Sequence, residues 1–148
     1  MYKRQLSATI KNSTIAYNTA KTGDAGGLKV ADLTESPVGG LVTVISTIIA
    51  ANKARSDVDI AGILTIDHSL IQSFGSATVT DLGGSIAGTA KLRPGLEKKG
   101  GPTSTIRLKT GSLALNAGSN PDALQFDQRG DGFARVKGTA IDIGAVEK

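Results

Sequence analysis

The sequence predicts an all-β protein folded as a parallel β-helix, a solenoid in which short strands stack coil upon coil. Three segments carry one pattern of β-branched residues: ATIKNSTIAYN from residue 8, VTVISTIIAAN from residue 42 and LTIDHSLIQSF from residue 64. β-branched residues favour strands over helices. A unit that cannot bury its apolar face alone stacks on its neighbours and shares a core with them. Aromatic residues make up only 3% of the chain, so we expect a core of thin aliphatic layers.

The spacing of the repeat predicts where the strands lie. The copies are offset by 34 and then 22 residues, and 22 residues hold two or three short strands, which is about one coil. The longer first spacing implies about 12 extra residues looped out within 19–27 or 31–40, since a solenoid tolerates such insertions. The strands are expected at residues 6–10, 13–16 and 27–30 in the first coil, at 41–45, 47–50 and 58–61 in the second, and at 63–66, 69–71 and 77–79 in the third.

Equivalent positions of the repeat hold chemically equivalent residues. Thr9, Thr43 and Thr65 form one column, which we interpret as a hydroxyl ladder on a sheet face, although flat threonine arrays can also bind ordered surfaces. Asn18 and Asn52 each follow a strand. Asparagine tolerates left-handed backbone angles and its amide can bond to the next coil, so we expect a turn ladder there. The other columns are Ile10, Val44 and Ile66; Ser13, Thr47 and Ser69; and Ile15, Ile49 and Ile71.

Composition excludes several classes of chemistry. A chain of 148 residues has room for one compact domain. Without cysteine it has no disulfide, no thiolate metal site and no thiol nucleophile. No apolar run is long enough to span a membrane. The net charge of +4 is scattered and aromatic residues for base stacking are scarce, so nucleic acid is not an expected partner.

The first five residues, Met1 to Gln5, match the translated end of a transposase adapter used in library preparation. We interpret residues 1–5 as a sequencing scar and leave them out of the fold prediction. The expected domain then has β-helix coils over residues 6–90 and a capping region over 91–148. The natural protein is expected to continue upstream with further coils.

The capping region contains an ordered set of motifs. They are GGPT at residues 100–103, LKTGSLALNAG at 108–118, DQRG at 127–130, Arg135, and DIGAVE at 142–147. This set resembles the C-terminal region of the choice-of-anchor Q proteins, whose pattern is NGGPT, LxxGSPAIDAG, DQRG, R and DIGAxE. The upstream segments STIIAAN and SDVDIAG are similar to that family's NTIIAGN and PDxxG. The departures are Lys99, Leu113 and Asn116, which stand where the family has asparagine, proline and an acidic residue.

The resemblance implies a right-handed parallel β-helix of the pectin-lyase type. It also implies a secreted bacterial protein that is held at the cell surface by a C-terminal anchor of variable type. On this basis we interpret the chain as the C-terminal fragment of an extracellular or cell-surface protein.

The charged residues of the last motifs are interpreted as a structural clasp. A β-helix has open ends, and an exposed strand edge invites aggregation unless something covers it. The planar fork of arginine can hold two carboxylates or cap strand carbonyls. We expect the clasp to fold the tail over the last coil. Its members are Asp127, Arg129, Arg135, Asp142 and Glu147.

A calcium site is the functional alternative for this region. Asp122, Asp127 and Asp131 could supply carboxylates, together with carbonyl oxygens. Arg129 lies close to two of these acids and would oppose a bound cation. We therefore favour the clasp, and no cofactor is expected.

Candidates for catalysis are few. Asp57 and Asp59 point to one face of an expected strand, roughly 6.5–7 Å apart, and Asp81 follows 22 residues after Asp59 and could stack above it. Paired carboxylates at this distance suit inverting glycoside hydrolysis, or could hold calcium for a lyase. The alternative is that these aspartates cap turns. The only histidine, His68, falls in the column of Asn12 and is expected to be a turn residue.

The sequence therefore favours a non-enzymatic module with a stalk, adhesin or surface-display role. Its expected partner is an extracellular polysaccharide or a ligand on a host or cell surface, which would contact the lateral face of the rod. The alternative on the same scaffold is a domain that binds or cleaves polysaccharide, because this fold hosts both enzymes and inert rods.

Overall fold

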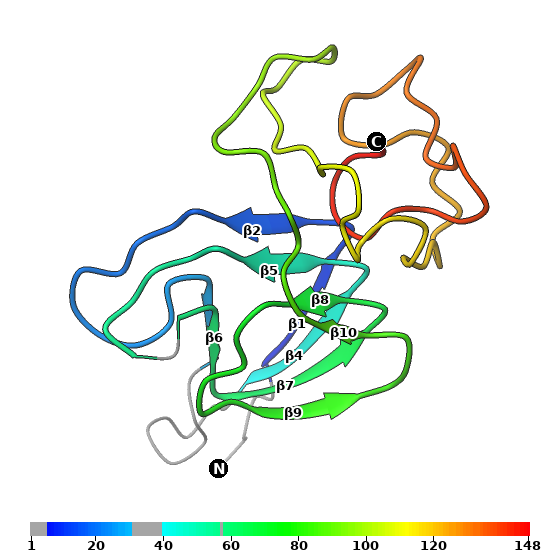
Figure 1. Ribbon diagram of the computed structural model, residues 1–148. Helices are drawn as coiled ribbons and strands as arrows, with labels where there is room; N and C mark the ends of the chain where they lie inside the picture. Colours follow the sequence, from blue (N-terminus) through cyan, green and yellow to red (C-terminus); the bar gives the residue numbers. More distant parts are fainter. Residues whose placement is uncertain (1–5, 31–39, 57) are drawn as a thin grey trace.

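The computed structural model describes residues 6–30, 40–56 and 58–148 (Figure 1). In these ranges every regular element is a strand, and no helix capable of crossing a membrane is found among them. All pairings between the strands are parallel. The strands are β1 (Leu6–Lys11), β2 (Thr14–Ala16), β3 (Leu28–Lys29), β4 (Gly40–Ile45), β5 (Ile48–Ala50), β6 (Ile60–Ala61), β7 (Ile63–Asp67), β8 (Leu70–Ile71), β9 (Thr78–Asp81) and β10 (Ile86–Ala87).

The strands form three sheets that are visited in turn along the chain. The first sheet has the order β1-β4-β7-β9, the second β10-β8-β5-β2, and the third pairs β3 with β6. We call β1–β2–β3 the first unit, β4–β5–β6 the second, β7–β8 the third and β9–β10 the fourth. Each unit adds one strand to each of the first two sheets. The prediction of an all-β, parallel arrangement is therefore confirmed.

The register of the sheets confirms the columns of the repeat. Thr9 pairs with Thr43, and Thr43 pairs with Thr65, so the offsets of 34 and 22 residues are those of neighbouring strands. Ile15, Ile49 and Ile71 align in the same way in the second sheet. The threonine column also has a fourth member, Thr80, which the sequence comparison did not identify.

One strand was assigned to the wrong sheet. Residues 77–79 were expected to form the third strand of the third coil, stacked on β6. Instead β9 pairs with β7 in the first sheet and begins a fourth unit. The chain between Ile71 and Thr78 is too short for the detour that β3 and β6 make in the first two units, so the third unit has only two strands.

The extra residues of the first unit fall mostly in one of the two predicted places. Thr19 and Asp24 form parallel bridges with Lys53 and Ser56, so residues 19–27 largely follow the second unit. Most of the extra residues therefore lie between β3 and β4, in the predicted segment 31–40. All of that segment except Gly40 is outside the described residues.

The second sheet is buried on both of its faces, which divides the apolar residues into two clusters. Ile49 and Ile71 belong to an inner cluster with residues of the first and third sheets, including Val44, Leu64 and Ile60. The opposite face of the second sheet packs against the C-terminal segment, residues 88–148. That outer cluster contains Ile48, Ala50, Leu70, Ala90, Leu92, Leu108, Ala114 and Ile143.

The C-terminal segment has no strand of its own among its described residues. Its regular pairing is limited to antiparallel bridges, Leu92 with Leu108, Glu97 with Thr105, and Phe126 with Ala134. Figure 1 shows it leaving β10, passing over the second sheet and ending beside β2. It is therefore held in place by side-chain packing and single hydrogen bonds rather than by a strand ladder.

The close packing between units gives a stability prediction at Gly62, which joins β6 to β7 with φ of +96°. A Cβ at this position would lie 2.1 Å from the carbonyl oxygen of Val30. Gly23 is the matched control, because its φ is +100° and a Cβ there would have no neighbour within 4 Å. We expect Gly23→Ala to lose about 1 kcal/mol in the free energy of unfolding and Gly62→Ala about 3 kcal/mol or more, measured by urea denaturation. Equal losses would contradict this packing.

Candidate functional site

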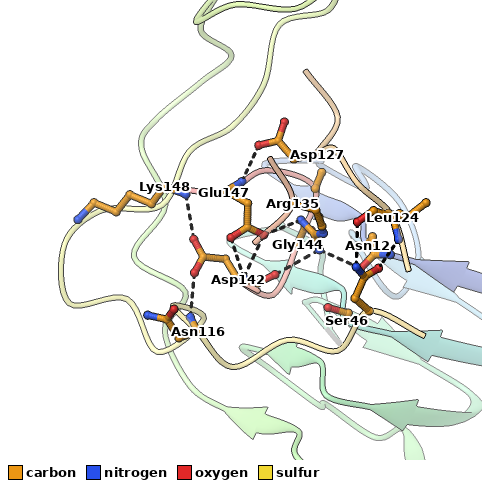
Figure 2. A network of polar contacts seen from close by, with 12 residues as sticks. Asn12, Ser46, Asn116, Leu124, Asp127, Arg135, Asp142, Gly144, Glu147 and Lys148 are labelled. Carbon is orange, nitrogen blue, oxygen red and sulfur yellow. Dashed lines mark hydrogen bonds and ion pairs between the residues drawn. The ribbon is translucent and has the colours of Figure 1, made fainter. Parts of the chain in front are cut away.

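The five residues of the expected clasp lie together in one buried cluster, which we call the C-terminal network. Arg135 is 1% exposed and Glu147 2%, and the other three are no more than 8% exposed. Burying five charged side chains is costly unless each is paired and hydrogen-bonded. Figure 2 shows how most of them meet beside the first two units.

Asp127 and Arg129 form the first half of the network. The guanidinium of Arg129 donates from Nη2 to Asp127 Oδ2 at 2.5 Å and from Nε to both carboxylate oxygens at 3.1 Å. The backbone N–H groups of Arg129 and Glu147 also donate to this carboxylate, at 2.8 and 2.9 Å. Burial alone would raise the pKa of Asp127, but these donors outweigh it and the pKa is lowered.

Arg129 also ties the final residues to the DQRG turn. Its Nη2 donates to the carbonyl oxygen of Glu147 at 2.7 Å. The guanidinium carbon lies 4.2 Å from the centre of the Phe133 ring, a cation–π contact. One arginine therefore contacts a carboxylate, a backbone carbonyl and an aromatic ring.

Arg135 joins the network to the first unit. Its Nη1 lies 3.0 Å from Glu147 Oε1 in an ion pair. Its Nη2 donates to Asn12 Oδ1 at 2.8 Å and to the carbonyl oxygen of Gly144 at 2.9 Å. Burial lowers the pKa of Arg135, and the neighbouring carboxylates oppose that effect.

Burial disfavours the charged form of Glu147, as it does that of Arg135. Burial raises the pKa of Glu147 to about 7, although the N–H of Asp142, which donates to both of its oxygens at 3.1 Å, acts in the opposite direction. The Asp142 carboxylate also raises the pKa, and Arg135 lowers it. Asp142 itself accepts from the N–H groups of Asn116 and Lys148, at 2.8 and 2.9 Å.

Asn116, one of the departures from the family pattern, contributes here through its backbone. Its N–H donates to Asp142 and its φ is +53°, a left-handed conformation that asparagine tolerates. Asn116 Oδ1 accepts only a long hydrogen bond, 3.4 Å, from the N–H of Ala140.

The network does not fold the tail over the last coil, and that part of the prediction is wrong. The N–H of Ala145 donates to Thr14 Oγ1 and the N–H of Gly144 donates to the carbonyl oxygen of Ser46, so the tail contacts the first and second units. The physical reason is the apolar outer face of the second sheet, which needs a cover along the side of the stack.

The partners Asn12, Thr14 and Ser46 were missed as members of this site. Asn12 and Ser46 share a corner column with His68, and the φ angles of the three are +46°, +48° and +42°. The prediction that His68 is a turn residue is confirmed. Its Nδ1 lies 2.6 Å from Asp67 Oδ1. In each repeat, the residue just before the Ser/Thr column occupies this corner, and that recurrence was the sequence signal that could have identified it.

Asn18, Asn52 and Asp59 form a second polar chain, at the opposite end of the second sheet's strands. Asn52 Oδ1 accepts from the backbone N–H and the side-chain amide of Asn18, both at 3.0 Å. The amide of Asn52 donates to Asp59 Oδ1 at 2.9 Å and to the carbonyl oxygen of Ile15 at 3.0 Å. Asp59 is fully buried. The asparagine pair thus links the first unit to the second, as predicted. The left-handed residues of this turn, however, are the preceding Tyr17 and Ala51, with φ of +61° and +58°.

Asp59 and Asp81, two of the three catalytic candidates, are not brought together. Asp81 aligns with Ile66 in the first sheet and accepts from the N–H of Gly83, so the expected stacking of Asp81 on Asp59 is wrong. The error follows from the assignment of β9 to the wrong sheet. Asp57 lies outside the described residues.

The three acids of the calcium alternative have different surroundings. Asp122 forms an ion pair with Lys11 at 2.8 Å, Asp127 is held by Arg129, and Asp131 is exposed. In the described ranges no group of three histidine or acidic side chains is arranged to hold a metal ion.

An open groove of about 520 Å³ lies beside the network. One wall is the corner of the first unit, residues 11–14, and the other is formed by the C-terminal segment, with Leu124, Phe126 and Gln128 among its members. Phe126 is 42% exposed and Leu124 43%. Arg135 lies at the junction of the groove and the network.

Comparison with known proteins gave no match: no protein-family model, no curated protein and no solved structure matches this chain.

The network predicts a large difference between two arginines. Replacing Arg129 by alanine leaves the buried Asp127 carboxylate without its cation, and we expect a loss of about 3–5 kcal/mol in the free energy of unfolding. Arg107→Ala is the control, since Arg107 pairs with Glu97 at 2.7 Å near the surface and should cost about 1 kcal/mol or less. Urea denaturation measures both. A loss at Arg129 no larger than that at Arg107 would show that the network does not hold the tail.

The network also predicts that stability falls as the pH rises through neutrality. The pKa of Glu147 is about 7 in the folded protein and is ordinarily about 4.5, so the folded state binds this proton more tightly than the unfolded chain. The resulting stabilisation is complete below about pH 4.5 and is lost as the pH rises through about 7. Asp127 acts in the opposite sense: its pKa is lowered, so its contribution is lost only on acidification below its ordinary range.

The measurement is the free energy of unfolding at several pH values between 5 and 8. For the unaltered chain we expect it to decrease across this range, and for Glu147→Gln to stay nearly level. Glu97→Gln is the control, because the hydrogen bond with Arg107 lowers the pKa of Glu97, and this variant should keep the slope. Stability that increases with pH in the unaltered chain would refute the assignment.

Proposed function

We propose that the chain is a right-handed parallel β-helix related to the choice-of-anchor Q proteins, and that it serves as a non-enzymatic, extracellular or cell-surface module. The β-helix proposal is supported by the in-register stacking of four units, each of which adds a strand to the same two sheets. The resemblance of the C-terminal motifs supplies the family, the right-handed sense and the location.

The observation that carries the non-enzymatic role is the internal use of Asp59, one of the catalytic candidates, and of the acidic groups of the C-terminal network. Asp59, Asp127, Asp142 and Glu147 are all buried, and each accepts hydrogen bonds from the chain itself. Catalysis of glycoside hydrolysis needs two carboxylates that face a substrate across an open site. Carboxylates that accept hydrogen bonds inside the protein do not face a substrate. They stabilise a rigid scaffold, which suits a stalk, adhesin or display element.

A second candidate is a polysaccharide-binding role on the first sheet. The threonine column lies on the face of the first sheet opposite the buried Leu64, and its members are Thr9, Thr43, Thr65 and Thr80. The apolar residues of the C-terminal segment pack on the second sheet and not on this face. Neighbouring strands are about 4.8 Å apart, so this face presents a regular row of hydroxyl and methyl groups. An extended glycan chain could lie along it.

An activity screen separates these functions from catalysis. Incubation with pectin, alginate and xylan should release neither reducing ends nor unsaturated uronides, whereas release that is lost in Asp81→Asn would establish an enzyme.

Affinity electrophoresis in gels containing the same polysaccharides tests binding. Retardation that is abolished by Thr43→Lys and Thr65→Lys would favour the second candidate. Accessibility of the protein to protease on intact bacteria tests the surface location.

A further inference from the structure

A second groove, of about 350 Å³, runs along the side of the stack where the strands of the second sheet end. One wall consists of the residues that directly follow β2, β5 and β8, which are Tyr17, Ala51 and Gln72. The other wall is part of the C-terminal segment and consists of Thr89, Ala90, Lys91, Leu92 and Lys109. The first three units therefore contribute to one lateral surface.

The backbone that shapes this groove is strained. Tyr17, Ala51 and Lys91 have φ of +61°, +58° and +48°, in the left-handed region that such residues rarely adopt. Strained residues of this kind cluster at binding sites. The Tyr17 hydroxyl donates to the carbonyl oxygen of Arg93 at 3.1 Å, and the residue is 42% exposed. The ring is thus held in place while much of it remains accessible from the groove.

Lys91 and Lys109 stand opposite each other in the hairpin of residues 91–109, which Figure 1 shows projecting from the second sheet. The N–H of Lys109 donates to the carbonyl oxygen of Lys91 at 2.8 Å. Like charges directly opposite each other in an antiparallel pair are destabilising. Neither lysine has an ion-pair partner in the described ranges, and no described residue that lines the groove is acidic.

The other pair of cations in this hairpin shows how such repulsion is relieved. Arg93 and Arg107 are also cross-strand neighbours, joined by a backbone hydrogen bond of 2.8 Å. Arg107 Nη2 lies 2.7 Å from Glu97 Oε2, and Arg107, together with Arg93, lowers the pKa of Glu97. The hairpin therefore supplies an anion to its arginine pair and none to its lysine pair.

We propose that this groove binds the phosphate monoester of a sugar, with the phosphate between Lys91 and Lys109 and the sugar ring against Tyr17. Two ammonium groups match the charge of a phosphate monoester, about −2 near neutral pH. The Gln72 amide and the Thr89 hydroxyl supply hydrogen-bond partners for sugar hydroxyls. The volume is at the lower end of the range of small-molecule sites.

Single-stranded nucleic acid fits this groove less well, although it also carries phosphate. It binds on several aromatic side chains that stack successive bases, and Tyr17 is the only aromatic residue among the described residues that line the groove. Binding here would be separate from the threonine face of the first sheet. The proposal therefore does not depend on the role of that face or on the location of the protein.

The first test is isothermal titration calorimetry of the unaltered chain with glucose 6-phosphate, glucose and inorganic phosphate. We expect glucose 6-phosphate to bind saturably with a Kd below about 1 mM. Glucose and inorganic phosphate should each bind about tenfold more weakly, because each lacks one part of the ligand. Equal affinity for inorganic phosphate, tighter binding of adenosine monophosphate or oligothymidylate, or no binding of glucose 6-phosphate would each overturn the proposal.

The second test compares two pairs of lysines. Lys91→Gln with Lys109→Gln should weaken glucose 6-phosphate binding by about tenfold or more. The matched control is Lys98→Gln with Lys99→Gln, which removes the same charge from exposed positions of the hairpin outside the groove and should change the affinity by less than about twofold. Equal losses would contradict a defined site. Nuclear Overhauser effects between the sugar and the Tyr17 ring in the unaltered chain test the pose without any substitution, and their absence would refute it.

A vesicle experiment distinguishes a free sugar phosphate from one carried by a lipid. The probes are phosphatidylcholine vesicles with and without monophosphoryl lipid A, a phosphorylated glycolipid. Cosedimentation that requires this lipid and is displaced by glucose 6-phosphate would identify a membrane-borne ligand, and calorimetric binding without cosedimentation would identify a soluble one. Equal cosedimentation with vesicles containing phosphatidylglycerol, which has no sugar, would overturn the proposal. None of these readouts depends on surface location or on polysaccharide binding, so they are distinguishable from failure of the proposed function.

Discussion

Burial of the second sheet on both faces is the constraint on which the rest of the structure depends. Ile49 points into the space between the sheets, and Ile48 and Ala50 point to the opposite side. A strand with apolar residues on both faces needs two covers. The first and third sheets supply one, and the C-terminal segment supplies the other. The units and the segment therefore share one apolar core, although among the described residues only the units contain strands.

The C-terminal segment covers the second sheet without forming strands, so its backbone groups need hydrogen-bond partners that a sheet would otherwise provide. Its backbone groups lack a ladder of partners, and buried groups of this kind are costly when unpaired. The two arginines of the C-terminal network help to meet this need, because their guanidinium groups donate to the carbonyl oxygens of Gly144 and Glu147 as well as to carboxylates. The network is thus less a set of ion pairs than a substitute for secondary structure. The remaining cost falls on Glu147, whose pKa is raised by burial, and on Arg135, whose buried Nε and Nη1 have no hydrogen-bond partner among the described residues.

The features of the fold that were predicted correctly from the sequence are those that depend on the two-residue alternation of side chains along a strand. The threonine, isoleucine and Ser/Thr columns were predicted correctly because a strand register slip of one residue would reverse every side chain. The strands of the third unit were harder to predict, because no local pattern in residues 72–77 indicates that this unit lacks a third strand equivalent to β3 and β6. The position of the tail was also mistaken. The uninterrupted run Ile48–Ile49–Ala50 was the available signal, since strands buried on both faces read as continuous apolar runs.

The contact between Arg135 and Asn12 spans 123 residues of sequence, and this separation affects how the protein is made. Synthesis proceeds from the N-terminus, so the strands of all four units leave the ribosome before the segment that covers the second sheet. Until the last residues emerge, Ile48 and Leu70 lack their outer cover and the nascent chain exposes an apolar sheet face. Chains with such delayed, long-range contacts fold slowly and are prone to aggregate on the way. Chaperone binding to the nascent chain would therefore be most valuable in the interval between the emergence of residue 87 and that of residue 148 from the ribosome.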